Sequence, residues 1–542
     1  MISNSTSSST PGISSPAAAL AIAIVGLGAL AVGLVAAPYR SFDLDRFFAP
    51  KELALHATAL LSALPLLIGR RRIAFSGVDV LLVLFLILSA ASAAFAGNHW
   101  LATRSLAVTW SSLVVFWAMS AAASGRSERE RAVAATLVIA VLATVAAALA
   151  QAYGIDSRYF STTRAPGGTL GNRNFVAHLA AIATPLLIVA AVGARRRLSA
   201  LVATVALAVT SAVLVLSRTR AAWIALAACA VVLLPGVWRA RTRWKVVGLR
   251  RRLLMVALAV TVTILAAVFV PNSLAWRSKS PYLDSVKSMT DYSEGSGRGR
   301  LVQYENTLKI ALHHPLLGVG PGNWPVVYPA TVHANDPSLD TDTGMTENPW
   351  PSSDWMAFIS ERGVPAVAVL ALALLALLAD AGGQIVAARD FEAHLRGLAL
   401  AGVVIATAVA GAFDAVLLLP PPALIAFAVF GALRSPPARR SMQLSAGARN
   451  LLLGTVAFVG VAAATRSALM VTAMANYERG DVSAAAREDP GSYRIQMRLA
   501  ESAQTRGRCD LVRVHASAAR ALFPNAPAPR RMLGACPRSA TR

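Results

Sequence analysis

The sequence GRGRLVQYENTLKIALHHPLLGVGPGNWPVVYP fills residues 297–329, and TENPWPSSDWMAFISERG fills residues 346–363. They belong to the longest polar interval in a chain that is otherwise a series of hydrophobic segments. Apolar residues at helical spacing predict a helix that stops at Pro315. The turn GVGPGN follows at residues 318–323, and its glycines allow positive φ and close approach to a ligand. We expect a polar loop held between apolar segments to carry the chemistry.

The composition is that of a membrane protein. Hydrophobic residues make up 56% of the 542 residues and charged residues 14%, which excludes an ordinary soluble domain. Lys and Arg (51) outnumber Asp and Glu (27), giving a net charge of +24. Because these cations lie mostly in short loops between apolar segments, they indicate a positive-inside signal rather than a nucleic-acid-binding surface.

The apolar segments predict an all-α polytopic bundle. A bilayer core about 30 Å thick needs about 20 apolar residues per helix, and this length predicts about 12–13 spans. The predicted spans are 18–37, 53–69, 77–96, 104–124, 132–152, 174–193, 199–217, 221–237, 253–270, 363–380, 396–414, 417–433 and 450–470.

The loops between these spans predict the orientation. The arginine-rich loops all fall on one side of the predicted bundle: 70–72, 126–131, 195–197, 239–252 and 434–449. The positive-inside rule then places the N-terminus in the cytoplasm and the loop 271–362 and the C-terminal tail outside. We therefore expect a disordered N-terminal tail (1–17), a membrane domain (18–470) and a small helical tail (471–542).

Three motifs in order resemble a known family. Arg300 is followed by Tyr304, then by HHPLLGVGPGNW (313–324), and then by an acidic-aromatic helix from Asp354 that ends at Gly363. This order is similar to the periplasmic loop of the O-antigen ligase and polymerase superfamily, and the resemblance covers roughly residues 150–380. In one respect the sequence departs from the family, which usually has His-Asn where Ser352 and Ser353 stand here.

The resemblance implies a glycosyltransferase in the bacterial inner membrane. Its donor would be a polyprenyl-diphosphate-linked glycan, and its acceptor lipid A core, a growing polysaccharide or a protein. Membrane lipids would be its other partners, with no nucleic acid, no metal and no cofactor. The alternative is a transporter or a non-catalytic membrane protein on the same scaffold.

The segment VLSRTRAAWIAL (215–226) carries two arginines at the predicted outer boundary, against the positive-inside trend. A boundary arginine is a functional candidate, because its planar fork can bind a diphosphate through two hydrogen bonds. The alternative is that these arginines simply snorkel to the interface. The family pattern aligns best on residues 219–223, which makes Arg220 the first candidate and Arg218 the second. The resemblance also assigns Arg300 to the donor diphosphate, so we expect Arg220 and Arg300 to share one cavity with the glycine turn and Asp354 nearby.

Further residues are implied as members of motif loops. The sequence GNRNF (171–175) can be read simply as a turn and a helix cap, whereas the resemblance makes it a family hallmark. His178, just inside the following span, is either a packing residue or a functional one. The motif-loop residues are Gly171, Asn172, Asn174, His314, Gly318, Gly320, Gly322, Asn323 and Glu361.

The acceptor hydroxyl needs orientation and a general base. With serine at position 352 in place of the family histidine, the candidates are Ser352 itself, Asp354 as the nearest carboxylate, and His333 upstream. Asp354 can equally be a helix-start residue that the helix dipole favours.

The tail has two features of its own. Pro490 and Pro524 stand 34 residues apart, the period of a tetratricopeptide repeat, although a generic helical hairpin fits equally well. Cys509 and Cys536 lie in a tail assigned to an oxidising compartment, and we predict a disulfide between them.

Overall fold

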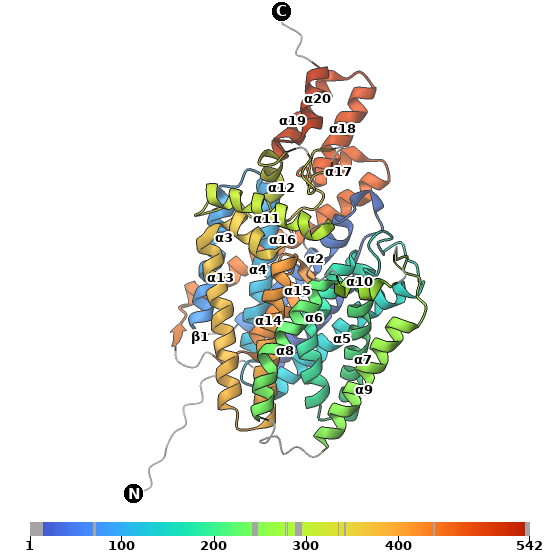
Figure 1. Cartoon of the computed structure of the whole chain (residues 1–542). Helices are drawn as coiled ribbons and strands as arrows, with labels where there is room; N and C mark the ends of the chain where they lie inside the picture. Colours follow the sequence, from blue (N-terminus) through green and yellow to red (C-terminus); the bar gives the residue numbers. More distant parts are fainter. Residues whose placement is uncertain are drawn as a thin grey trace, which may run out of the picture.

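The protein is described by a computed structural model that covers residues 15–68, 72–240, 248–276, 278, 280–287, 295–333, 335–340, 343–436 and 440–536. Long helices run alongside one another in a bundle, and short helices gather at one of its ends (Figure 1). Eleven helices among the described residues are long and apolar enough to cross a membrane. The predicted fold class, an all-α polytopic membrane protein, is confirmed.

The helices of the bundle are α1 (Ser15–Leu34), α2 (Asp45–Leu67), α3 (Gly77–Ala94), α4 (His99–Ala122), α5 (Ser127–Ala152), α6 (Arg173–Gly193), α7 (Arg197–Ser217), α8 (Arg220–Ala240), α9 (Leu249–Phe269), α13 (Asp354–Ala387), α14 (Phe391–Phe413), α15 (Pro420–Leu433) and α16 (Ala446–Glu478). The remaining helices are η1 (Arg40–Phe42), η2 (Gly168–Leu170), α10 (Pro281–Lys287), α11 (Gly295–His313), α12 (Trp324–Val327), η4 (Tyr328–Ala330), α17 (Val482–Glu488), α18 (Tyr493–Thr505), α19 (Cys509–Leu522) and α20 (Pro527–Ala535). Strands β1 (Arg72–Phe75) and β2 (Arg440–Gln443) pair antiparallel, with Arg72 opposite Gln443.

The burial of the helices shows how the bundle is layered. Most of α6 and α14 is buried inside the protein, and every residue of α15 is buried. By contrast, α9 is apolar but almost wholly exposed. A helix that is hydrophobic on all sides needs either a protein core or lipid around it, so α9 fits a lipid-facing position.

Two of the predicted spans differ from the other eleven. The helix expected at 53–69 is α2, whose first half buries Lys51 and Glu52 and is therefore less apolar than a plain span. Glu52 pairs with Arg104 at 2.9 Å, which compensates its buried charge. The helix expected at 417–433 is α15, which has only 14 residues and is shorter than a bilayer core requires.

The structure brings the basic loops together at one end of the bundle. Arg131 and Arg195 both pair with Glu392, and Arg396 pairs with Glu130 at 3.3 Å. Ser124 donates a hydrogen bond to the backbone oxygen of Arg434. Figure 1 shows β1 near this end and α18–α20 at the opposite end. Of the predicted basic loops, residues 70, 71, 241–247 and 437–439 lie outside the described residues.

Helices cross the predicted domain boundaries at both ends of the chain. Residues 15–17, expected in the disordered tail, form the first turn of α1, and residues 1–14 lie outside the described residues. At the other end α16 continues to Glu478, so the separate helices of the tail begin with α17 rather than at residue 471.

Gly363 marks the boundary predicted between the outer helix and the next span. Inside the 34-residue α13 it has φ 83° and ψ 167°, and a side chain there would collide with the backbone of Leu316. Val364 donates to the backbone oxygen of Pro315 at 2.8 Å. The segment from Asp354 to Gly363 is therefore fixed against the polar loop rather than running straight into the span.

The tail packs on the rest of the protein through specific hydrogen bonds. Asn98 donates to the backbone oxygen of Leu522 at 3.0 Å, and Asn525 donates to that of Val326 at 3.1 Å. Cys509 and Cys536, the predicted pair, form a disulfide with Cα atoms 5.4 Å apart. The tetratricopeptide-like character of the tail stays a prediction.

Removal of this disulfide is expected to loosen the tail. A crosslink between residues 27 apart restricts the unfolded chain, and such crosslinks stabilise by about 2–4 kcal/mol. The double variant Cys509→Ser/Cys536→Ser should therefore be cut in α18–α20 at a lower protease concentration than the wild type. Reducing agent should sensitise only the wild type; equal sensitivity of both proteins without reductant would contradict the prediction.

Candidate functional site

The polar interval forms an ordered layer over one end of the bundle. It has a small core of Ile310, Trp324, Tyr328 and Leu339, and the indole of Trp324 donates to Thr307 at 2.9 Å. Burial raises the pKa of Tyr328 to about 12, so its phenol stays protonated and donates to a carboxylate oxygen of Asp336 at 3.2 Å. Figure 1 shows α11 and α12 at the same end as α18–α20. The predicted helix before Pro315 is α11, which ends at His313.

Two glycines of the turn, Gly318 and Gly320, pack tightly against other parts of the protein. Gly318, Gly320 and Gly322 have φ of 65°, 102° and 69°, and side chains added at the first two would meet the backbone of Glu361 and the side chain of Ala96. Gly320 also donates to the backbone oxygen of Glu361 at 2.8 Å. The turn therefore anchors the polar interval to α3 and α13, and the close approach that glycine allows is to the protein itself.

Asn323 and Asn172 of the motif loops form hydrogen bonds with backbone groups. Asn323 is fully buried, accepts from the backbone N–H of Asn98 at 2.7 Å and donates back to its backbone oxygen at 3.1 Å. Asn172 caps α6 by accepting from the backbone N–H of Asn174 at 3.0 Å. Gly171, just before it, has φ 79° and packs against the ring of Phe47.

The carboxylate of Asp354 holds the loop between α14 and α15 in place through hydrogen bonds. It accepts from the backbone N–H groups of Val416, Leu417 and Leu418 at 2.9, 2.8 and 3.4 Å, and the residue is 1% exposed. Asp354 is the first residue of α13, and Ser353 caps that helix by accepting from Met356. This geometry matches the helix-start alternative and adds an anchoring role for the loop between α14 and α15.

The other acid–base candidates are Ser352, two residues before Asp354, and His333. The backbone of Ser352 is held by Gln303, which accepts from its N–H at 2.6 Å, and by Tyr304, which donates to its backbone oxygen at 2.5 Å. His314 and His333 are both exposed on the polar interval.

Asp414, which was not predicted from the sequence, lies beside residues that were predicted to bind the donor diphosphate. Asp414 ends α14 and is 7% exposed; its Oδ2 lies 3.9 Å from the Arg300 guanidinium and accepts from Asn174 at 3.3 Å. Asn174 in turn accepts from Thr219 at 3.1 Å, and Thr219 directly precedes Arg220, the first residue of α8. The ends of α6, α8, α11 and α14 therefore meet here. The signal in the sequence was a lone aspartate between apolar runs, GAFDAVLL (411–418).

Arg173 and Arg218 directly precede Asn174 and Thr219 in the sequence, and both of their side chains lie near Trp276. The guanidinium of Arg218 lies 4.7 Å and that of Arg173 5.2 Å from the ring centre of Trp276. Arg218 also donates to Ser285 at 2.8 Å and has a left-handed backbone with φ 54°. The two like charges repel each other, and the nearby carboxylate of Asp284 offsets part of the charge of Arg218. The sequence reasoning had not singled out Arg173 or Trp276.

We refer to this group as the arginine cluster, and its members are Arg173, Arg218, Arg220 and Arg300 with Asn174 and Asp414. His178 lies one turn after Asn174 in α6 and is fully buried. Neither of its ring nitrogens has a hydrogen-bond partner among the described residues. The cluster thus combines several cations, one carboxylate and a buried imidazole.

The comparison with known families bears on this region. Residues 203–371 match the family model described as O-Antigen ligase. The predicted resemblance to the O-antigen ligase superfamily is confirmed. The matched segment contains Arg218, Arg220 and Arg300, whereas Arg173, Asn174 and Asp414 lie outside it. No curated protein matches the chain. The match supports a family of membrane enzymes that transfer glycans.

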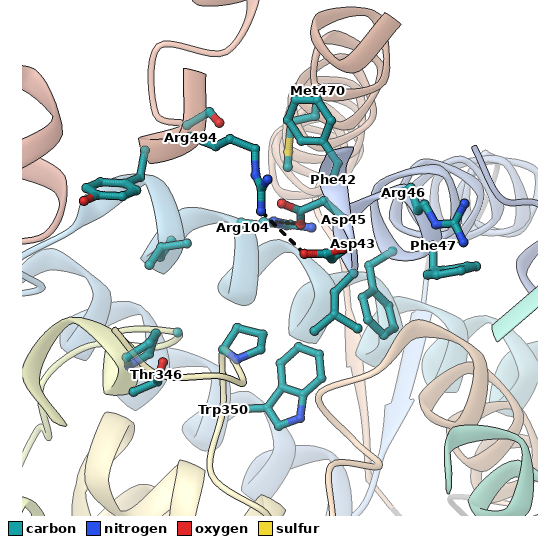
Figure 2. Close-up of a pocket in the computed structure, with 18 of the residues that line it drawn as sticks. Phe42, Asp43, Asp45, Arg46, Phe47, Arg104, Thr346, Trp350, Met470 and Arg494 are labelled. Atoms are coloured by element: carbon teal, nitrogen blue, oxygen red, sulfur yellow. Dashed lines mark ion pairs between the residues drawn. The ribbon is translucent and has the colours of Figure 1, made fainter. Parts of the chain in front are cut away.

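A cavity of about 1100 Å³ lies at the same end of the protein (Figure 2). Three of the predicted motif residues line it, namely Gly171, Gly322 and Glu361. The members of the arginine cluster and Asp354 are not among its lining residues, so this is not a cavity that Arg220 and Arg300 share. The ring of Trp350, which lines it, lies 6.1 Å from that of Phe175, the residue after Asn174. Leu418 and Leu419, which follow Asp414 in the loop that Asp354 anchors, also line it.

Proposed function

We propose that the protein is an O-antigen ligase-like glycosyltransferase that moves a glycan from a polyprenyl-diphosphate-linked donor to an acceptor hydroxyl. The reaction takes place at the periplasmic face of the bacterial inner membrane. The observation that carries this proposal is the contact series from Arg300 through Asp414 and Asn174 to Thr219, beside Arg220. It joins positions that the family resemblance assigns to one ligand, and the family match supports glycan transfer.

The arginines of the cluster bind the diphosphate. When the bond between the sugar and the diphosphate breaks, negative charge grows on the departing oxygen. Guanidinium groups fixed around that oxygen stabilise the charge because they do not have to reorganise during the reaction. Arginine suits this role better than lysine, since its planar fork makes two parallel hydrogen bonds to phosphate oxygens.

Asp414 is our candidate for the general base. The carboxylate of Asp354 is occupied by three backbone N–H groups. Oδ1 of Asp414 accepts from the backbone N–H of Ala415, and the contacts of its Oδ2 among the described residues are with Asn174 and, at 3.9 Å, with Arg300. The acceptor hydroxyl gives its proton to Asp414 while its oxygen forms the bond to the anomeric carbon. The diphosphate leaves with the electron pair of the broken bond. Asp414 thus takes the place of the family histidine, where this chain has Ser352.

The orientation is a further part of the proposal, with the arginine cluster and the tail outside. Single cysteines introduced by Asn335→Cys and Ser441→Cys test it, because both residues are exposed and they lie on the polar interval and on β2. A membrane-impermeant thiol reagent added to intact spheroplasts should label only the first variant, and both after lysis. Labelling of the Ser441→Cys variant alone in intact spheroplasts would place the cluster in the cytoplasm and contradict the proposal.

Deletion of the gene in its host tests the activity itself. Loss of glycan from lipid A core, from protein, or from chains longer than one repeat would each identify the acceptor class. Restoration by the wild-type gene but not by the Arg300→Ala variant is the expected result. An envelope whose glycans are unchanged in length and attachment would contradict the proposed function.

A further inference from the structure

The cavity described above is lined by parts of the chain that lie far apart in sequence. Three of its walls come from residues 40–48, from the polar interval at 340 and 343–350, and from the tail at 489–501, and residues of α4, of 160–164 and of α16 line it as well. Figure 2 shows Arg494 of the tail and Trp350 of the polar interval reaching toward it from opposite sides, with Asp43 and Asp45 between. At about 1100 Å³ it is slightly larger than most ligand sites, which leaves room for several sugar rings.

We propose that this cavity binds an oligosaccharide and that the C-terminal tail is one wall of the binding site. The inference rests on the proposed function, because the bound chain is then the acceptor glycan or the glycan of the donor. It goes further by giving the tail a role in recognition.

The lining has the chemistry that sugars need. Sugar rings have apolar C–H faces, which pack on aromatic rings, and polar hydroxyl edges, which need hydrogen-bonding groups. Aromatic side chains come from all three walls, and they include Phe42, Phe47, Trp350, Tyr493 and Phe523. Tyr493 and Phe523 pack edge to face, with ring centres 5.3 Å apart, so the tail offers a fixed aromatic corner.

The charge balance of the lining favours a sugar over a polyanion. Seven arginines and eight acidic side chains line the cavity, although the whole chain carries +24. The arginine cluster is different, because among the described residues its four arginines outnumber the carboxylates beside them, Asp414 at Arg300 and Asp284 at Arg218. A phosphorylated ligand is therefore expected at the arginine cluster, and a polyhydroxyl chain with little net charge in the cavity.

The polar groups of the cavity are held in place before any ligand arrives. Arg104 pairs with Asp45 at 2.8 Å and with Glu52 at 2.9 Å. Arg494 pairs with Asp43 at 3.5 Å and thereby joins the tail to the segment before α2. The largely buried pair of Arg104 with Glu52 reduces the ordering that binding would otherwise require, whereas the pair of Arg494 with Asp43 is exposed.

One buried oxygen in the lining lacks a partner. Glu361 is 1% exposed, and its Oε1 accepts from the backbone N–H of Trp324 at 3.3 Å. Its Oε2 has no hydrogen-bond partner among the described residues. A buried carboxylate oxygen without a partner is unfavourable, so a ligand hydroxyl that donates to it would be bound firmly.

The test uses the full-length protein in lipid nanodiscs. The probes are oligosaccharides of three to eight residues released by mild acid from the envelope polysaccharide of the host, free of lipid and diphosphate. Native mass spectrometry should detect binding to the wild type. Arg494→Ala and Glu361→Gln should each weaken binding by about tenfold, the size expected for one hydrogen bond to a charged group. Arg520→Ala, an exposed arginine of the same tail, is the matched control and should bind as the wild type does.

The inference is overturned if the oligosaccharides do not bind, or if Arg494→Ala and Glu361→Gln both bind as the wild type does. Preferential binding of glycerophosphate headgroups at this site would also overturn it. Arg300→Ala separates this inference from the proposed function, because it should abolish transfer and leave oligosaccharide binding intact. Binding that depends on Arg494 in a protein without transfer activity would contradict only the proposed function.

Discussion

Asp414→Asn is expected to lower the rate of glycan transfer by about 10²- to 10⁴-fold, the range for loss of a general base. Asparagine has nearly the shape of aspartate and can still accept a hydrogen bond from Asn174, but it cannot take a proton. Asp414 is the C-cap of α14, and because asparagine keeps its size and hydrogen-bonding shape we expect the variant to insert and fold normally. The measurement is transfer per folded molecule in membranes, with protein amounts compared by immunoblot.

Asp354→Asn is the matched control for this prediction. The two carboxylates lie close in space, because the backbone N–H of Asp354 donates to the backbone oxygen of Asp414 at 3.3 Å. Asp354 holds three backbone N–H groups of the α14–α15 loop, so its replacement should lower thermal stability more than the rate per folded molecule. The reverse pattern, with full activity in Asp414→Asn and a stable but inactive Asp354→Asn, would return the base to Asp354.

Arg300→Lys is expected to lower transfer by about 10²- to 10³-fold, as loss of one preorganised donor does in other enzymes. Lysine keeps the positive charge beside Asp414 but lacks the fork that binds two phosphate oxygens. The side chain of Arg300 is 25% exposed, so the substitution should leave folding unchanged. Transfer is measured with a donor concentration series, because a lost diphosphate contact should affect both affinity and rate.

Arg298→Lys is the control on the same helix. Arg298 lies two residues earlier in α11 and is exposed, so it should retain wild-type activity. If both Arg300→Lys and Arg300→Ala transfer glycan at the wild-type rate, Arg300 does not bind the donor diphosphate.

The sequence was sufficient for features that depend on local pattern. Apolar length and composition predicted eleven of the spans, because any helix that crosses lipid must be apolar throughout. The break at Gly363 was also visible, since a glycine at the end of an acidic-aromatic helix allows a conformation that other residues avoid. The pairing of Cys509 with Cys536 followed from the oxidising compartment expected for the tail.

The remaining features depend on contacts between distant segments. Asp414 lies 114 residues after Arg300, and nothing local to either residue indicates that they meet. Glycines in the 318–322 turn suggested a ligand, but the same positive φ serves equally well to pack a loop against a helix. The predicted span 53–69 left out the first part of α2, which carries charged residues that are unfavourable in a membrane. In the structure Arg104 pairs with one of them, Glu52, and compensates its charge. The cavity beneath the tail has walls from three distant segments and could not be inferred from any one of them.

The most direct test is a reaction with purified components. Full-length protein in nanodiscs is given a synthetic polyprenyl-diphosphate-linked oligosaccharide and an acceptor glycan, and free polyprenyl diphosphate and extended acceptor are measured together. The account predicts that the wild type forms both products in equal amounts, whereas Arg300→Ala and Asp414→Asn form little of either. The proposed function would be contradicted if the donor stays intact after incubation with the wild type and the acceptor class identified in the host. Equal product from all three proteins would also contradict it.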